Sequence, residues 1–281
     1  MPSREEMIPM SGNKELSSIA EESLSNVSVG EYDRWFTHFH CGQVLEFYLE
    51  RIKAIGFFDK QNVLDVACGI GQYSLALALL NKTVQGLDLK SSRIEIARQL
   101  CSTAGAANVN FVRGNAERLP YADEAFDAVF CFDTLEYVCV RKAIKEFARV
   151  LRPGGVCYIN VHSLGSLLRL IIERGLLGLN SEATRATGGR AKVIRVHSHL
   201  LWRTLWFHHL RRTIISGIWP SEKFIRGILN ANGLVVREFR GDGEIGQAKR
   251  KLAKLARFED FYPARYLGLW CVFELMAEKP S

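Results

Sequence analysis

The fold of this chain is set by one short stretch, Val63-Leu64-Asp65-Val66-Ala67-Cys68-Gly69-Ile70-Gly71. It begins as an apolar strand and ends in a tight glycine turn, and Gln72 opens a segment with the character of a helix. Nineteen residues past Gly69, a second apolar strand ends in the carboxylate Asp88. A strand, a glycine turn, a helix and an acid about 20 residues further on are typical of a parallel α/β sheet that holds the ribose of an adenosyl cofactor.

The glycine turn differs from the turn of dinucleotide-binding folds. Those folds usually carry a third glycine that lets helix and strand pack closely around a pyrophosphate, and here Ser74 takes that position. The carboxylate of Asp65 lies just before the turn. It would repel a pyrophosphate and would attract a cationic ligand such as an amino acid or a sulfonium.

Further motifs follow in order, and together with the first stretch they carry a family resemblance. They are Asn110-Phe111-Val112-Arg113-Gly114-Asn115-Ala116-Glu117-Arg118-Leu119-Pro120-Tyr121, Phe126-Asp127-Ala128-Val129-Phe130-Cys131 and Leu151-Arg152-Pro153-Gly154-Gly155. The set resembles the class I S-adenosylmethionine-dependent methyltransferases, in particular their small-molecule, type 11-like branch. The chain departs from the usual motifs at Ala67, which replaces a glycine, and at Asn115, which replaces an aspartate.

The resemblance implies the cofactor S-adenosyl-L-methionine and the residues that bind it. Asp88 would bind the ribose, the turn with Asn115 would contact the adenine, and Tyr32 would close the site from a leading helix. The implied cofactor-binding residues are Tyr32, Asp65, Ala67, Cys68, Gly69, Gly71, Asp88, Leu89, Asn115, Ala116, Glu117 and Phe132.

Structural explanations for several of these residues remain open. Asp65 can accept backbone amides of its own loop, and Asp88 can cap the following helix. Cys68 is better explained as a small apolar packing residue than as a nucleophile. Phe132 either lines the mouth of the methyl-transfer site or, with Asp133, simply begins a helix.

The order of apolar segments predicts an α/β fold, a Rossmann-like doubly wound sheet of seven strands. Strands are expected at 62–66, 83–88, 109–113, 126–132, 156–161, 234–239 and 270–277, and helices at 31–56, 71–80, 91–105, 141–151 and 222–231. The resemblance implies that the last strand is antiparallel.

The remaining segments are assigned by length and composition. Residues 1–28 mix acids and serines with few apolar residues and are expected to form a mobile tail before a methyltransferase domain at 29–281. Insertions at about 163–220, after strand five, and at 241–267 are longer than ordinary connections. In the family such insertions cover the acceptor, and the first is expected to be a helical cap.

The positive charge of the chain is concentrated in this region. The chain carries a net charge of +7, whereas Arg185 to Arg257 holds 16 Lys or Arg against 4 Asp or Glu. A lid over an apolar acceptor pocket is the favoured explanation. Peripheral contact with an anionic membrane is a second. Nucleic acid binding is the least favoured, because no RNA-binding module is recognisable.

Composition excludes some settings. No run of 18 apolar residues is present, so no membrane span is expected. The seven cysteines are scattered without C-x-x-C pairs, which indicates reduced thiols and a cytoplasmic location. Nothing in the sequence specifies an oligomeric state.

The function expected is methyl transfer to a small, hydrophobic or aromatic acceptor, at oxygen. Such an acceptor must lose a proton, and His162, directly after strand five, is the expected base. Tyr137 stands where many relatives carry a histidine, which removes one candidate base. His197 and His199 have no clear carboxylate partner, so no metal site is expected. The alternatives are a non-catalytic cofactor-binding scaffold subunit and an RNA or protein methyltransferase that uses the basic cap.

Overall fold

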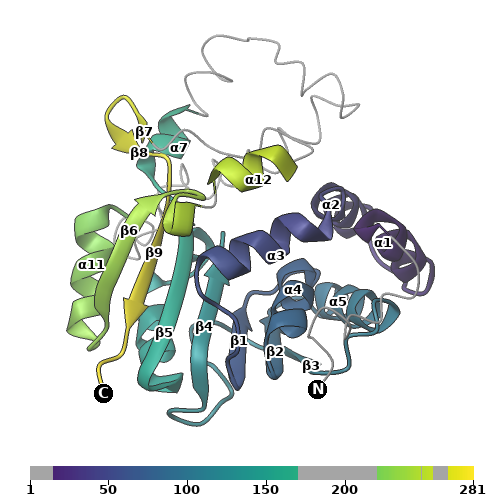
Figure 1. The fold of residues 1–281 in the computed structure, drawn as a ribbon, viewed down its shortest axis with the longest axis horizontal. Helices are drawn as coiled ribbons and strands as arrows, with labels where there is room; N and C mark the ends of the chain where they lie inside the picture. The colour runs from purple at the N-terminus through teal and green to yellow at the C-terminus, as the bar shows by residue number, and fades with distance from the viewer. Residues whose placement is uncertain (1–14, 170–219, 248, 256–264) are drawn as a thin grey trace, which may run out of the picture.

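The structure, a computed structural model, describes residues 15–169, 220–247, 249–255 and 265–281. Its centre is a seven-stranded sheet of order β3-β2-β1-β4-β5-β9-β6 (Figure 1). The strands are β1 (Asn62–Val66), β2 (Thr83–Asp88), β3 (Val109–Arg113), β4 (Phe126–Phe132), β5 (Leu151–His162), β6 (Val235–Gly241) and β9 (Val272–Glu278). β9 runs antiparallel to both of its neighbours, and the other pairs are parallel. The predicted fold is confirmed, including the antiparallel last strand.

Helices cover both faces of the sheet. They are α1 (Leu16–Ser25), α2 (Glu31–Cys41), α3 (Leu45–Ala54), α4 (Gln72–Leu80), α5 (Ser91–Thr103), α6 (Val140–Val150) and α11 (Glu222–Ala231). Shorter elements are the 3-10 turns η2 (Leu135–Tyr137) and η4 (Ile245–Gln247), the helices α7 (Leu164–Arg169) and α12 (Lys249–Leu255), and the hairpin β7 (Arg265–Tyr266) with β8 (Leu269–Trp270).

The strand residues alternate between two hydrophobic cores. Val63, Phe130 and Tyr158 face the core that α1, α3, α4 and α5 complete. The neighbouring positions Leu64 and Val129 face the other core, which α6 and α11 complete. Because side chains along a strand point to opposite faces in turn, nearly continuous apolar strands are what a sheet covered on both sides requires.

The sheet order reverses between β1 and β4, and this reversal determines where a ligand can bind. β1 lies between β2 and β4, and the chain leaves β1 toward one edge before returning to β4 on the other side. The carboxyl ends of parallel strands meet at one edge of the sheet, and the crevice at such a reversal is where α/β folds bind ligands. The loops that follow β1, β2, β4 and β5 are therefore neighbours.

The amino-terminal segment differs from the expected mobile tail. Residues 16–25 form α1, and Leu16, Ile19, Ala20 and Leu24 are buried. These residues recur at helical spacing and pack α1 against α5 and α2. The acids and serines between them form the outer part of an amphipathic helix, which composition alone does not separate from a tail. Residues 1–14 lie outside the described residues.

Two element boundaries also differ from those expected. The helical segments predicted near 31–56 are α2 and α3, and the break between them at residues 42–44 was not placed from the sequence. β5 begins at Leu151, earlier than expected, and pairs there with Phe126. The chain around Gly154 and Gly155 also exchanges backbone hydrogen bonds of 2.7 and 2.9 Å with Lys279. These contacts extend the strand through a turn-like sequence.

Much of the predicted acceptor-side cap lies outside the described residues, at 170–219 and 256–264. The described part of the second insertion includes α12, which packs against α3 (Figure 1). Lys251 of α12 forms an ion pair of 3.2 Å with Glu50 of α3. Within the described ranges, no helix has both the length and the apolar character needed to cross a membrane.

Candidate functional site

The glycine turn after β1 requires an unusual backbone. Ala67, Gly69 and Gly71 have φ angles of 58°, 57° and 85°. A Cβ atom at Gly71 would lie 2.9 Å from the Cβ atom of Ala97 and 3.1 Å from its Cα atom. Any larger residue at 71 would therefore push α5 away from the turn and would also adopt a strained φ. Ala67 also adopts a left-handed conformation, and its methyl group is the smallest side chain other than that of glycine, which keeps the strain low.

Asp88, at the end of β2, connects the two loops at this edge. Its Oδ2 accepts the backbone N–H of Gly69 at 3.1 Å, and its Oδ1 accepts that of Lys90 at 2.8 Å. The residue is only 5% exposed. Each carboxylate oxygen keeps a further lone pair, so Asp88 can accept two more hydrogen bonds. Asp88 does not bond the amides of the first turn of α5, which weighs against the alternative that it serves as a helix cap.

Asp65 is buried beneath the turn. The Ser74 hydroxyl donates to Asp65 Oδ2 at 2.6 Å. Ser74, which stands in place of a third glycine, thus supplies a partner for the acid. Burial raises the pKa of Asp65 to about 7, although the Ser74 hydrogen bond lowers it, and the negative charge of Asp88 raises it further. A nearby cationic ligand would favour the ionised form of this carboxyl.

Helix α2 lies over the loops that follow β1 and β2. A Cβ atom at Gly69 would lie 3.8 Å from Phe36 Cε1. The guanidinium of Arg93 lies 4.3 Å from the centre of the Phe36 ring, and Asp33 accepts the hydroxyl of Ser92 at 2.6 Å. These contacts fix α2 to the start of α5.

Tyr32 is one turn before Phe36 on the same helix. Its ring is 5.3 Å from Lys90 Nζ, and the residue is 41% exposed. Tyr32 therefore lies at the loop that follows β2, and Phe36 of the same helix lies beside the glycine turn. Sequence reasoning did not select Phe36; its spacing of four residues from Tyr32 was the available signal.

The predicted adenine turn follows β3 and reaches the same place. The backbone N–H of Gly114 donates to the Asp88 carbonyl at 2.9 Å. Asn115 Oδ1 accepts the backbone N–H of Glu117 at 2.9 Å, so the amide already closes its own turn. Glu117 Oε1 accepts the backbone N–H of Cys139 at 2.8 Å, so this side chain connects the turn to the start of α6. Ala116 is buried, and Leu89 is 61% exposed beside Asp88.

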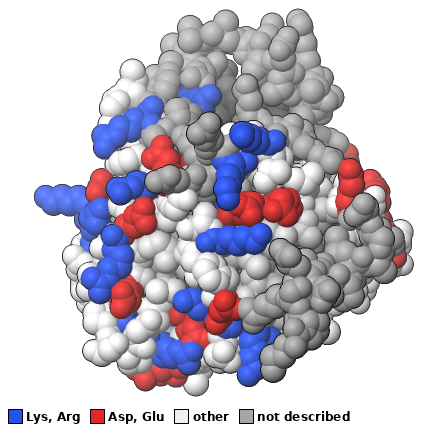
Figure 2. Space-filling view, in the orientation of Figure 1, with Lys and Arg blue, Asp and Glu red and all other residues white. Residues whose placement is uncertain are grey.

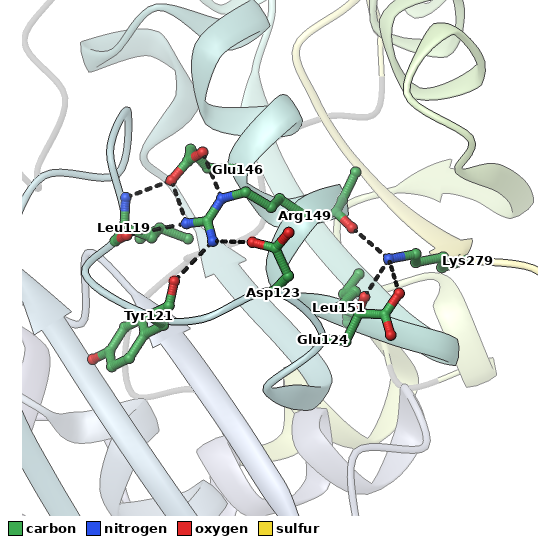
Figure 3. Close-up of polar contacts among 9 residues, drawn as sticks. Leu119, Tyr121, Asp123, Glu124, Glu146, Arg149, Leu151 and Lys279 are labelled. Carbon is green, nitrogen blue, oxygen red and sulfur yellow. Dashed lines mark hydrogen bonds and ion pairs between the residues drawn. The ribbon is translucent and has the colours of Figure 1, made fainter.

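Arg149 of α6 holds this turn in place (Figure 3). Its guanidinium donates to the carbonyls of Leu119 at 3.1 Å and Tyr121 at 2.8 Å, and to Asp123 Oδ1 at 2.8 Å. Glu146 accepts Arg149 Nε at 3.0 Å and Arg149 Nη2 at 2.8 Å, and also accepts the Leu119 backbone N–H at 2.7 Å. The turn is thereby tied to α6 through side chains.

Replacement of Arg149 by methionine tests this clamp. We expect Arg149→Met to lower the free energy of unfolding by roughly 1–3 kcal/mol, the range for charged hydrogen bonds whose partners are left partly buried. Chemical denaturation measures this change. Lys145→Met, at an exposed position of the same helix, is the matched control and should change stability by less than about 0.5 kcal/mol. Equal effects in the two variants would contradict the assigned role of Arg149.

A second group of polar side chains lies at the ends of β4 and β5. His162 Nε2 lies 2.9 Å from Asp133 Oδ1, and His162 Nδ1 lies 3.0 Å from Ser166 Oγ. Burial lowers the pKa of His162, but the charge and the hydrogen bond of Asp133, together with the charge of Asp242, outweigh burial and raise it. Burial and the negative charge of Asp133 both raise the pKa of Glu136 well above its usual value. The expected base thus has both ring nitrogens in contact with protein atoms.

His40 approaches this group from α2. Burial lowers the pKa of His40 to about 4, which the negative charge of Asp133 only partly offsets. Its ring packs on Phe36 with centroids 4.2 Å apart. Phe132, at the end of β4, packs against Tyr73 with centroids 4.7 Å apart. Phe132 therefore ends the strand inside an aromatic cluster and directly precedes Asp133.

The cysteines have packing roles. All seven are free, and burial raises the pKa of the Cys68 thiol well above its usual value. Cys68 lies below the turn, where a Cβ atom at Gly86 would be 3.2 Å from its sulfur. A neutral, enclosed thiol packs against the sheet, as its sequence context indicated. His197 and His199 lie outside the described residues.

A family model described as a methyltransferase domain matches residues 64–159, the segment that runs from the glycine turn to β5. This segment, about a third of the chain, is similar to class I methyltransferase domains. This family uses S-adenosylmethionine as its methyl donor. The match confirms the resemblance found in the sequence, and it includes Asp65, Asp88 and Asn115.

Individual proteins of known sequence or structure are also similar to this chain. The ubiquinone/menaquinone biosynthesis C-methyltransferase UbiE of Haemophilus ducreyi is 40% identical over 109 residues, which are 37% of this chain and 42% of that protein. A geranyl diphosphate methyltransferase solved with S-adenosylmethionine shares the methyltransferase fold at a TM-score of 0.53 and 16% identity, covering 92% of this chain and 94% of the other. The [4+2]-cyclase SpnF also shares this fold, at a TM-score of 0.53 and 20% identity, covering 84% of this chain and 80% of the other. The curated relatives are matched over 22% to 63% of their own length.

Proposed function

We propose that this methyltransferase domain binds S-adenosylmethionine between the glycine turn and Asp88 and transfers its methyl group to a small, hydrophobic or aromatic acceptor, at oxygen. The observation that carries the proposal is the position of Asp88. Its buried carboxylate joins the glycine turn to the loop after β2 and keeps lone pairs for further donors.

The chemistry of these residues fits the cofactor. The two ribose hydroxyls are donors that the oxygens of Asp88 can accept. Asp65, with a pKa of about 7, is a carboxyl whose ionised form a cationic group would stabilise. The exposed side chain of Leu89, directly after Asp88, offers an apolar surface for a base. Tyr32, Asn115 and Ala116 are proposed to complete the site.

The cofactor supplies an activated methyl group on a sulfonium. The protein must therefore align the acceptor and exclude water. Phe36 of α2 covers the turn at Gly69, and Tyr32 lies beside Lys90. Phe132, packed against Tyr73, is proposed to form an aromatic wall of the acceptor site next to Asp133. His162 is proposed to take part in ionising the acceptor hydroxyl, together with Asp133, from the end of β5.

The proposed acceptor is small and apolar, which the names of similar proteins support. One acts in ubiquinone and menaquinone biosynthesis, and another is a geranyl diphosphate methyltransferase. The aromatic wall at Phe132 fits an acceptor of that kind. The shared fold alone does not establish methyl transfer, because a [4+2]-cyclase has it too.

The basic segment gives less support to a membrane or nucleic acid partner than its net charge suggests. Several of its described cations are paired, namely Arg226 with Glu222, Arg237 with Glu278, Arg240 with Glu238 and Lys251 with Glu50. Figure 2 shows acidic and basic side chains interspersed over the described surface of one face. A small-molecule acceptor therefore remains the proposed partner.

Transfer of a labelled methyl group tests the proposal. The purified chain is incubated with methyl-labelled S-adenosylmethionine and a panel of phenols, quinone precursors, isoprenoids, amines and sugars. We expect label in an apolar or aromatic hydroxyl compound, and mass spectrometry locates the methylated atom. Tight cofactor binding without transfer to any member would favour the scaffold alternative, and transfer only to RNA or protein would favour the other.

A further inference from the structure

The polar group at the ends of β4 and β5 forms a compact set of metal-ligand types. Asp133 follows β4, Glu136 lies in η2 and His162 ends β5. One ligand atom from each lies within 4.8 Å of the other two. Among the described residues, this is the group of carboxylate and imidazole side chains that could hold one metal ion.

The spacing of these atoms is close to that of a coordination shell. Ligands about 2.1 Å from an ion are roughly 3 Å apart when adjacent and roughly 4.2 Å apart when opposite. The 2.9 Å between His162 Nε2 and Asp133 Oδ1 already matches an adjacent pair. The ligand atoms lie within 4.8 Å of one another, which is less than 1 Å more than the distance between two opposite ligands. A side-chain movement of that size would bring all three atoms to coordination distance of one ion.

The hydrogen bonds of Ser166 orient the imidazole for such a role. The Ser166 hydroxyl donates to the carbonyl of Cys271 at 2.7 Å. A hydroxyl has one proton, so toward His162 Nδ1, at 3.0 Å, Ser166 acts as the acceptor and Nδ1 carries the hydrogen. In the neutral ring the Nε2 lone pair then points to Asp133. A lone pair facing a carboxylate requires a positive charge between them, supplied either by a proton or by a cation. A bonded Nδ1–H is also the usual arrangement behind a metal-ligating histidine.

Glu136 provides an independent observation. It is only 3% exposed, and its Oε2 has no hydrogen-bond partner among the described residues. A buried carboxylate oxygen without a partner is destabilising. An oxygen of the same carboxyl group belongs to the set with the two other ligand atoms, so a cation held there would balance the charge of this side chain. The Asp133 side chain is 42% exposed, which leaves one side of the group open to further ligands.

We infer that Asp133, Glu136 and His162 bind a divalent cation at the acceptor side of the methyltransferase domain. Two carboxylates and one imidazole suit Mn²⁺ or Zn²⁺ better than a sulfur-seeking metal. The set was not expected from the sequence, because His162 lies 26 positions after Glu136 and further still from Asp133. Only the pairing of β4 with β5 brings the histidine to the two acids. Binding of the cation is independent of methyl transfer. Its role toward the acceptor, to bind and polarise the acceptor oxygen, rests on the proposed function. In that role His162 contributes as a ligand of the cation and does not itself take the proton.

Mn²⁺ alone, without S-adenosylmethionine or acceptor, is the probe. The full chain, freed of metal by chelation and of any affinity tag, is titrated with Mn²⁺, and the free ion is followed by electron paramagnetic resonance. We expect one saturable site below millimolar concentration. Glu136→Gln and Asp133→Asn should each weaken it at least about 10-fold. Asparagine tolerates the φ of 50° at position 133, so this variant keeps the local backbone.

Glu95→Gln, at a half-exposed acid of α5 outside the group, is the matched control and should bind as the wild type does. Crystals soaked in Mn²⁺ give a second measurement that needs no variant, an anomalous peak between His162 Nε2 and the two carboxylates. Absence of saturation up to millimolar Mn²⁺, or equal affinity in all variants, would overturn the inference. Mn²⁺ binding in a chain that transfers no methyl group would support the site and reject only its role toward the acceptor.

Discussion

Asp88→Ala should weaken the binding of S-adenosylmethionine by about 10- to 100-fold. The replaced carboxylate is buried, and a hydrogen bond to a charged group contributes roughly 1.5–3 kcal/mol, which corresponds to that range. The same substitution removes the acceptor of the Gly69 and Lys90 backbone amides, so the glycine turn also loses its connection to the loop after β2. Isothermal titration calorimetry measures the affinity.

Two further variants separate these effects. Asp88→Asn keeps one side-chain oxygen and should fall between the wild type and Asp88→Ala. Glu95→Ala removes an exposed acid of α5 whose ion pair with Arg98 is 3.6 Å long, and it should leave the affinity unchanged within about twofold. Thermal unfolding of each variant shows whether the fold is retained. Wild-type affinity in a folded Asp88→Ala variant would remove Asp88 from the site.

Arg51→Met should strongly destabilise the folded protein. Arg51 Nη1 of α3 lies 2.8 Å from Asp242 Oδ1 and 3.4 Å from Glu274 Oε2, and all three side chains are buried. Tyr158 and Asn160 donate to the same carboxylates at 2.7 and 2.9 Å. Loss of the cation leaves buried carboxylates without a counter-charge, which costs about 3–5 kcal/mol. Urea denaturation measures the difference.

The deficit of Arg51→Met should depend on pH. Burial already raises the pKa of Glu274 above its usual 4.5 in the folded protein, although Arg51 lowers it. Without Arg51 this pKa rises further, so the folded variant binds a proton more tightly than the unfolded chain does. The deficit should therefore be small near pH 5 and should grow as the pH rises to 8.

A matched control exists on the same helix. Lys53 of α3 is half-exposed and pairs with Glu50 at 3.1 Å. Lys53→Met should cost less than about 1 kcal/mol at any pH between 5 and 8. A similar, pH-independent loss in both variants would show that the buried charge network does not stabilise α3 against the sheet.

The core elements could be predicted from sequence because their signals are local. β1, β2, β3 and β4 occur at the expected residues, since each is an apolar run ended by a turn. The local hydrophobic pattern did not reveal α1, because its five buried positions are spread among acids and serines. It also failed at Leu151, where pairing with Phe126 and with the end of the chain extends β5 through a Pro-Gly-Gly sequence.

The candidate site could be predicted only in part, for a similar reason. Asp65, the glycines and Asp88 belong to motifs whose spacing is fixed along the chain. Phe36 and the group at Asp133 depend on how separate elements pack, which single-sequence reasoning does not provide. In the network at Arg51, the partners Asp242 and Glu274 lie 191 and 223 positions further along the chain, so no local sequence pattern indicates it.

The most direct test of the account is a crystal structure of this chain with S-adenosylhomocysteine, the demethylated cofactor. The account predicts that both ribose hydroxyls donate to Asp88 and that the adenosyl group lies beneath Phe36, beside the turn from Ala67 to Gly71. A crevice that stays filled by protein side chains, or a ligand bound away from Asp88, would contradict it.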